Sequence, residues 1–281
     1  MRISTLVGLL LPALAICEPY DSWIDLGVSH MNAGRLEAAE PILRKALVAA
    51  EGTLGQSHWK VNQVRLLIGK VEYAKGRYTA ADSAWRRALS SIEISSPEAA
   101  ETAGALQLNL GELRRFERRF SEAESLLSQA VAALETLGTG HVLLPAALNH
   151  LALTCFEQGK WADAERLYLR ALALVEKSSD AAGLQHAVIL HNLGRLRVQQ
   201  SAVADAEALF RGALEIKEKV LGAGHSSLKP LLYDYAQLLR TVRRGKEAAI
   251  LRARMKKITE PDRETFLDLR DVRRVETRSK Q

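Results

Sequence analysis

The sequence contains little proline, glycine or cysteine. Its 281 residues include only 7 prolines and 18 glycines. This scarcity of helix breakers favours long helices over a turn-rich β fold. One of the 2 cysteines, Cys17, lies in an N-terminal targeting segment, so no disulfide is expected within the folded part. The other, Cys155, falls at a core position of a predicted helix, and we interpret it as a small buried apolar residue.

Short motifs for catalysis and for metal or phosphate binding are also absent. No Cys-x2-Cys, His-Glu-x2-His, calcium-loop, glycine-rich phosphate-loop or Gly-x-Ser-x-Gly pattern occurs. Three of the seven histidines, His58, His141 and His225, each follow a Gly-x2 step and lie 83 and 84 residues apart. Stacked helices would hold them too far apart to share an ion, so we interpret them as turn and cap residues. The sequence predicts no metal, no cofactor and no enzymatic activity.

The charge of the chain is modest, and part of it lies at the C-terminal end. The formal net charge is +6, and the stretch from Arg252 onward holds ten Lys/Arg and six Asp/Glu. Nucleic acid or anionic lipid would normally need a denser basic cluster, so neither is an expected partner. Glu260-Pro261-Asp262 should end the preceding helix. Residues 259–281 are therefore expected to form a charged tail or a cap on the fold.

The N-terminus has the pattern of a secretory signal peptide over residues 1–17. Met1-Arg2 is followed by an apolar run from Ile3 to Ile16, which is too short for a comfortable membrane span. We expect export to the periplasm or the outside of the cell. Two alternatives remain open: an uncleaved anchor, and a lipoprotein signal in which Cys17 is lipidated. The bulky Ile16 departs from the lipoprotein pattern, and only these two alternatives would place the chain at a membrane.

A repeat of about 42 residues organises most of the chain. Its first column of alanines has intervals of 42, 42, 41, 42 and 42 residues, and consists of Ala39, Ala81, Ala123, Ala164, Ala206 and Ala248. A second column seven residues later reads Ala46, Ala88, Ala130, Ala171, Ala213 and Met255. A turn column five residues before the first reads Gly34, Gly76, Arg118, Gly159, Ser201 and Arg243. Self-similarity at a fixed period is the signature of a repeat architecture.

Each unit is predicted to be a pair of antiparallel helices joined by a short turn. In the fourth unit, apolar periodicity predicts a first helix at about 141–158 and a second at 161–177. The small side chains of Ala164 and Ala171 allow the two backbones to approach closely. Ser96 with Pro97 predicts a helix start, and Ser121 to Glu124 resembles a capping box. A single pair cannot bury its apolar faces, so the pairs should stack into a solenoid.

These columns resemble the tetratricopeptide repeat family. In the first unit the matching residues are Trp23, Leu26, Gly27, Gly34, Leu36, Ala39, Leu43 and Ala46. The long period, the Leu221 to His225 link and the Leu148 to Leu151 segment are similar to kinesin light chain repeats. The resemblance implies an all-α, right-handed superhelical solenoid of six antiparallel helix pairs over residues 18–258. The sixth unit departs from the pattern at Gly245, Arg252 and Met255, and we expect a terminal cap with a polar outer face.

The resemblance also implies a function, in which the first helix of each unit lines a concave groove that binds a protein or peptide. The inward positions that this predicts are Lys70, Tyr73, Glu112, Arg115, Phe116, Asn149, Phe156, His191, Arg195, Tyr233 and Arg240. The cations in this set suit a ligand with acidic residues, the aromatic rings suit stacking, and an Asn side chain suits a peptide amide. The alternative is a structural or self-assembling protein that uses its convex face or its ends.

Overall fold

The computed structural model describes residues 19–177 and 183–258, which are helical throughout apart from short connections. The predicted signal peptide, Cys17 and the charged tail at 259–281 lie outside the described residues. The helices are α1 (Pro19–Asn32), α2 (Leu36–Leu54), α3 (Trp59–Ala74), α4 (Tyr78–Ser91), α5 (Pro97–Phe116), α6 (Phe120–Thr136), α7 (Leu144–Glu157), α8 (Trp161–Lys177), α9 (Leu184–Gln199), α10 (Val203–Leu221), α11 (Lys229–Thr241) and α12 (Gly245–Lys257). A short 3-10 helix, Ser226–Leu228, precedes α11. The prediction of an all-α fold is confirmed.

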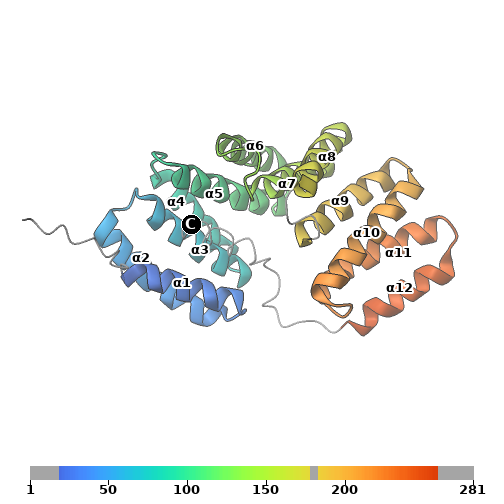
Figure 1. The fold of residues 1–281 in the computed structure, drawn as a ribbon, viewed down its shortest axis with the longest axis horizontal. Coiled ribbons are helices and arrows are strands. Elements are labelled where there is room, and N and C mark those ends of the chain that lie inside the picture. Colours follow the sequence, from blue (N-terminus) through green and yellow to red (C-terminus); the bar gives the residue numbers. More distant parts are fainter. Residues whose placement is uncertain (1–18, 178–182, 259–281) are drawn as a thin grey trace, which may run out of the picture.

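The helices pair in chain order, and the pairs follow one another around an arch (Figure 1). The closest packing is between each odd-numbered helix and the even-numbered helix that follows it. Along the arch, the odd-numbered helices contact one another: α1 with α3, α3 with α5, α5 with α7, α7 with α9, and α9 with α11. Helices that approach one another more closely lie on the inside of a curved array, so the odd-numbered helices form its inner layer. The predicted right-handed sense and the count of six repeats stay predictions.

The predicted boundaries and caps are largely confirmed. Helix α8 begins at Trp161 and ends at Lys177 as predicted, whereas α7 begins at Leu144, three residues later than expected. The imidazole Nδ1 atoms of the three in-phase histidines accept backbone N–H groups in their turns, at 3.2 Å from Lys60, 3.3 Å from Leu143 and 3.2 Å from Ser227. The hydroxyl of Ser96 caps α5 by accepting from the backbone N–H of Ala99.

The predicted capping box at Ser121 is wrong. Helix α6 already begins at Phe120, and its N-cap Arg119 makes no side-chain cap bond. The start is set by the preceding turn, where Arg118 has a left-handed φ of 62° and the backbone N–H of Arg119 donates to the carbonyl of Arg114. All six residues of the predicted turn column have a positive φ, from 60° to 75°. The next residue closes each turn with a Schellman-type hydrogen bond, which keeps the conformation even where glycine is absent.

Two kinds of small residue let the helices of a pair approach closely. Every alanine of the first column is 0–1% exposed, and the alanines of the second column are 0% exposed. On the odd-numbered helices, Gly27, Gly69, Gly111 and Gly194 each face a large side chain of the partner helix: Leu43, Trp85, Leu127 and Phe210. A Cβ atom at these glycines would lie 2.1–2.6 Å from that side chain. The glycines therefore leave the space that these large core side chains occupy.

A ladder of ion pairs joins each helix pair to the next. The residue after each of the first five column alanines is acidic and pairs with a cation of the following unit, in the pairs Glu40–Lys75, Asp82–Arg114, Glu124–Lys160, Glu165–Arg197 and Glu207–Arg244. The hydrogen bond from Lys75 lowers the pKa of Glu40 to about 2. Lys160 lowers the pKa of Glu124, and Arg244 lowers that of Glu207. We call these pairs the acidic ladder.

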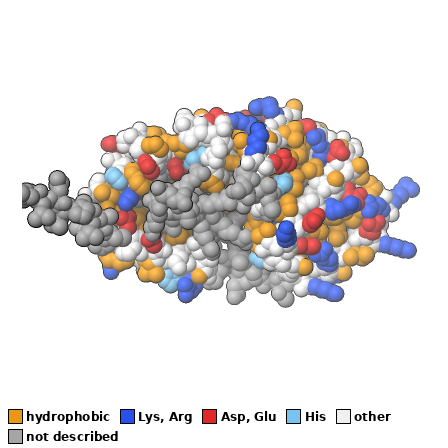
Figure 2. Space-filling model, in the orientation of Figure 1, with side chains coloured by type: hydrophobic (Ala, Val, Ile, Leu, Met, Phe, Trp, Pro, Cys, Tyr) orange, Lys and Arg blue, Asp and Glu red, His pale blue; other side chains and the backbone are white. Residues whose placement is uncertain are grey.

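Charges of both signs are otherwise interspersed over the face seen in Figure 2. Helix α12 buries only Ala248 and Leu251 among its side chains, which fits the polar outer face expected of it. In the described ranges, no helix is long and apolar enough to cross a bilayer.

The close approach of α3 and α4 gives the first prediction. Replacement of Gly69 by Ala should push Trp85 away and break the hydrogen bond from its indole Nε1 to the carbonyl of Leu66, at 3.1 Å. We expect a loss of about 1–3 kcal/mol in unfolding free energy, measured by denaturant titration. Gly52→Ala is the matched control, because nothing lies within 4 Å of a Cβ there. It should stabilise the helix by up to ~1 kcal/mol, and equal effects of the two changes would contradict this account.

The acidic ladder gives a second prediction, on pH. A carboxyl whose folded-state pKa lies below its unfolded value of 4.5 stabilises the fold above pH 4.5, and this contribution is lost as the pH falls towards 2. Glu40→Gln should therefore be roughly 1–2 kcal/mol less stable than the wild type at pH 7, and the difference should shrink between pH 5 and pH 2. Thermal denaturation across that range measures it. Glu215→Gln, at an exposed carboxyl outside every ion pair of the described chain, should show no such convergence.

Candidate peptide-binding groove

The predicted groove residues all lie on odd-numbered helices, at positions that repeat from pair to pair. Arg115 and Arg240 occupy the position eight residues before the column alanine, as do Tyr73 and Phe156. These helices form the inner layer of the arch, so the predicted groove would be assembled from side chains that are far apart in the sequence. Neighbouring inner helices are linked by the side chains described next.

The two central arginines of the groove already have partners within the chain. An Arg115 Nη1 atom on α5 lies 2.9 Å from an oxygen of Glu157 on α7. The guanidinium of Arg195 on α9 stacks over the ring of Phe156, 5.2 Å from its centroid, and its Nε lies 3.7 Å from Asp234 on α11. Each interaction bridges two inner helices. A carboxylate ligand would therefore have to compete with Glu157 and Asp234 for these arginines.

His191 belongs to the same network. Its Nε2 lies 2.8 Å from Asp234, and its ring meets Phe210 edge-on at 5.8 Å. Burial lowers the pKa of His191, and the carboxylate of Asp234 opposes that shift. The residue is only 9% exposed, so its side chain supports the junction of α9 and α11 more than it offers a surface.

An exposed aromatic strip lies where α3, α4 and α5 meet. The ring of Tyr73 lies 5.3 Å from that of Tyr78, which lies 5.4 Å from that of Phe116. Phe116 is 58% exposed and Tyr78 40%. Burial raises the pKa of Tyr73 to about 12, and the neighbouring Glu112 adds to the shift. We call Tyr73, Tyr78 and Phe116 the aromatic strip. Tyr78 was missed as a site residue, although its place two residues after the turn glycine marks the start of α4.

The remaining predicted residues differ in how accessible they are. Asn149 is 5% exposed, and its Oδ1 accepts a hydrogen bond from Nδ2 of Asn192 at 3.0 Å, so its oxygen serves the contact between α7 and α9. Tyr233 is 52% exposed on α11. Arg240 is exposed and donates to Gln237 on the same helix. Lys70 is half-buried on α3 and also has an interaction partner.

Sequence reasoning also missed the polar end of Tyr168. This side chain is fully buried, and its hydroxyl has no hydrogen-bond partner. Burial raises its pKa, and the charges of Arg195, Glu157 and Arg115 act on it from the inner layer. The positions equivalent to Tyr168 hold leucine, tryptophan or phenylalanine in the other well-formed units, so only this unit buries an unpaired hydroxyl there.

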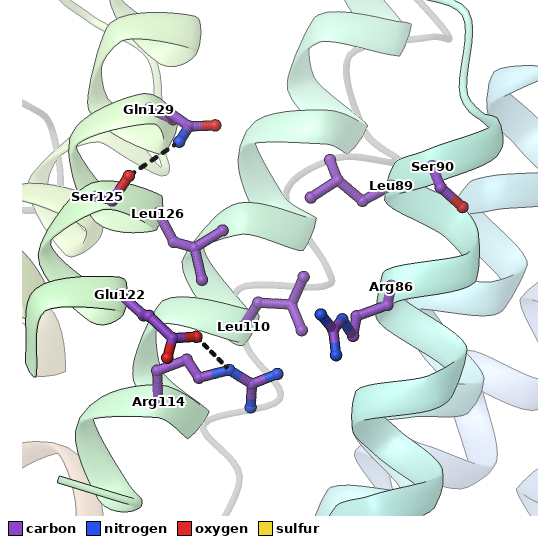
Figure 3. A pocket seen from close by; sticks show the side chains of 9 residues that line it. All are labelled: Arg86, Leu89, Ser90, Leu110, Arg114, Glu122, Ser125, Leu126 and Gln129. Carbon is purple, nitrogen blue, oxygen red and sulfur yellow. Dashed lines mark hydrogen bonds and ion pairs between the residues drawn. The ribbon is translucent and has the colours of Figure 1, made fainter. Parts of the chain in front are cut away.

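A concavity lies between two even-numbered helices, α4 and α6. It has a volume of ≈ 430 Å³ and is floored by Leu110 of α5, between Leu89 of α4 and Leu126 of α6 (Figure 3). Its rim is polar, and the Nε of Arg114 lies 3.6 Å from the Oε2 of Glu122 there. No pattern of the sequence indicated this site, because it depends on the separation of α4 and α6. Among the described residues, no three His, Cys, Asp or Glu side chains come together as a metal site requires.

Comparison with known proteins places this geometry among solved repeat structures. BtubC (BKLC) from P. vanneervenii superposes with a TM-score of 0.60 at 17% identity, over 87% of this chain and 94% of that one. A putative kinesin light chain from Podosopora anserina, with nearly identical TPR-like repeats, gives 0.56 at 20% identity over 71% and 94%. The apo form of the quorum sensor NprR from B. thuringiensis gives 0.70 at 13% identity over 85% and 65%. At these identities the similarity establishes the fold alone.

Sequence comparison identifies the family. No curated protein sequence matches the chain. Tetratricopeptide repeat models match residues 24–60, 102–177 and 143–219, which together make up more than half of the chain. The matched segments contain four of the six alanines of the first column, Ala39, Ala123, Ala164 and Ala206. The chain belongs to the tetratricopeptide repeat proteins.

Proposed function

We propose that the chain is a non-catalytic scaffold that holds a peptide segment of a partner protein in the groove of its inner helices. The observation that carries this proposal is the aromatic strip. Exposed rings of Tyr78 and Phe116 lie side by side on a fold whose other large apolar side chains are mostly buried. Aromatic groups of this kind supply much of the affinity of peptide-binding surfaces.

The ion pairs of the groove would then set selectivity. A ligand carboxylate could replace Glu157 at Arg115 or Asp234 at Arg195, and a ligand cation could pair with the same acids. The four cations among the predicted groove residues, Lys70, Arg115, Arg195 and Arg240, favour acidic residues in the ligand. The solved neighbours include a quorum sensor and a putative kinesin light chain, and these names fit a scaffold that binds other molecules.

A peptide-display selection against the purified protein tests the proposal. We expect the selected peptides to combine acidic residues with large apolar or aromatic ones, and to bind less tightly as salt is raised. Phe116→Ser removes an exposed ring at little cost to the fold, and it should weaken binding roughly tenfold, measured by fluorescence anisotropy.

Leu169→Ser is the matched control for this experiment. Leu169 is 43% exposed in the middle of α8, an outer helix, and does not occupy the repeat position of Tyr78, so its loss should leave peptide affinity unchanged. Peptides that bind Phe116→Ser as tightly as the wild type, or that lose affinity only with Leu169→Ser, would place the site on another face and contradict the proposal.

We also propose that the chain functions outside the cytoplasm, on the sequence pattern of residues 1–17. The mature protein recovered from cells should begin at Glu18, or at Cys17 if that residue is lipidated. Intact-mass measurement distinguishes the two, because lipidation adds the mass of the acyl chains. Recovery of a chain that still begins at Met1 would instead support an uncleaved anchor or a protein that is not exported.

A further inference from the structure

Among the described residues, no helix precedes α1, so one face of α1 lacks the neighbouring helix that every later odd-numbered helix has. Thirteen residues before the column alanine, the later units place Ile68, Leu110, Leu151, Leu193 and Tyr235, which are 2–8% exposed. Each belongs to a core cluster that includes the preceding even-numbered helix. In α1 the same position holds Leu26, which is 47% exposed. A leucine side chain is therefore exposed at the position where, in every later unit, an even-numbered helix packs.

Polar side chains on the same face also lack the partners that their equivalents have. Nine residues before the column alanine, Glu72, Arg114 and Arg197 each form an ion pair with the preceding even-numbered helix. The equivalent residue in α1 is His30, whose Nδ1 is buried without a hydrogen-bond partner.

The cation that ends the turn after each odd-numbered helix shows the same difference between α1 and the later units. Four residues before the column alanine, Arg77, Lys160 and Arg244 pair with the acidic ladder of the preceding unit. Arg35 occupies this position after α1. It is exposed, and the described part of the chain provides it with no ion pair. We call Leu26, His30 and Arg35 the end face.

The five internal junctions define the chemistry that fits such a face. At each junction, the preceding even-numbered helix contributes a column alanine that is followed by a carboxylate: Glu40, Asp82, Glu124, Glu165 or Glu207. A second copy stacked head to tail would offer α12 instead. That helix has Ala248 followed by Ala249, and it carries Arg252, Arg254, Lys256 and Lys257. It would bring cations towards Arg35 and no carboxylate at the required position, so charge disfavours self-stacking.

We propose that the end face docks an amphipathic helix of another protein, one in which a small residue that packs on Leu26 is followed by a carboxylate that pairs with Arg35. This surface is separate from the groove of the inner helices. Leu26 supplies the apolar contact, and the cation of Arg35 fixes the register of the incoming helix. The site would bind a helix of another protein in the way in which each internal junction binds the preceding even-numbered helix of this chain.

A stapled helical peptide with the sequence of α6, Phe120–Thr136, serves as the probe, because it presents Ala123 and Glu124 as an internal junction does. A staple reduces the ordering cost of binding. Anisotropy of the labelled peptide should report saturable binding to the full chain. Leu26→Glu and Arg35→Glu should each weaken it roughly tenfold or more. A probe with Glu124→Lys should bind the wild type weakly and regain affinity for Arg35→Glu.

Two variants serve as controls. Ile250→Glu changes an exposed apolar residue on α12, at the other end of the array, and should not affect the probe. Phe116→Ser should also leave probe binding unchanged, so failure of the end-face proposal and failure of the groove proposal are distinguishable. Circular dichroism should show the same helix content for all variants, because Leu26 and Arg35 are exposed.

Four outcomes would overturn the proposal. The first is no binding of the α6 probe, and the second is binding that is indifferent to both end-face substitutions. The third is a dimer, seen by light scattering, that Leu26→Glu dissociates, which would assign the face to a second copy. The fourth is probe binding that appears only after residues 1–18 are removed, which would assign the face to that segment of the chain.

Discussion

The close approach of the two helices in each pair is the contact on which the rest of the structure depends. Glycine on the inner helix faces a large side chain of the outer helix at Gly69 and Trp85, and again at Gly194 and Phe210. The missing Cβ allows that side chain to cross over the inner helix and to reach its neighbours on the inner layer. Trp85 contacts Tyr73 in this way, and Phe210 contacts His191. The same packing that closes the pair therefore supports the residues of the candidate groove from behind.

Contacts between pairs follow a different rule, in which apolar burial and charge act together. Apolar clusters run across the junctions between pairs, and the acidic ladder places one ion pair at each junction. Isolated surface ion pairs contribute little, but a carboxyl such as Glu40, which is shared by several cations, is held in place more firmly. Because each pair contacts only its neighbours, a change at one junction should stay local.

Properties that repeat along the chain could be predicted from the sequence, and those that depend on neighbouring pairs could not. The 42-residue period and the alanine columns predicted the pairing of the helices, the buried positions and the bounds of α8. The capping box at Ser121 was wrong because the backbone conformation of Arg118 starts α6 two residues earlier. The ion pair of Arg115 with Glu157 joins residues 42 positions apart in sequence, and only the spacing of α5 and α7 brings them together. Asn149 shows the same limit, since periodicity places it on the inner side but Asn192 of α9 determines what it binds.

The contacts of the candidate groove residues rank them differently from their formal charges. Arg115 and Arg195 are already paired, so a ligand carboxylate gains only the difference between two similar ion pairs. The rings of Tyr78 and Phe116 can lose bound water to a ligand without giving up a contact within the chain, since they touch one another and remain exposed. Affinity in this groove should therefore come from the aromatic strip, with the arginines selecting among ligands by the strength of the competing carboxylate.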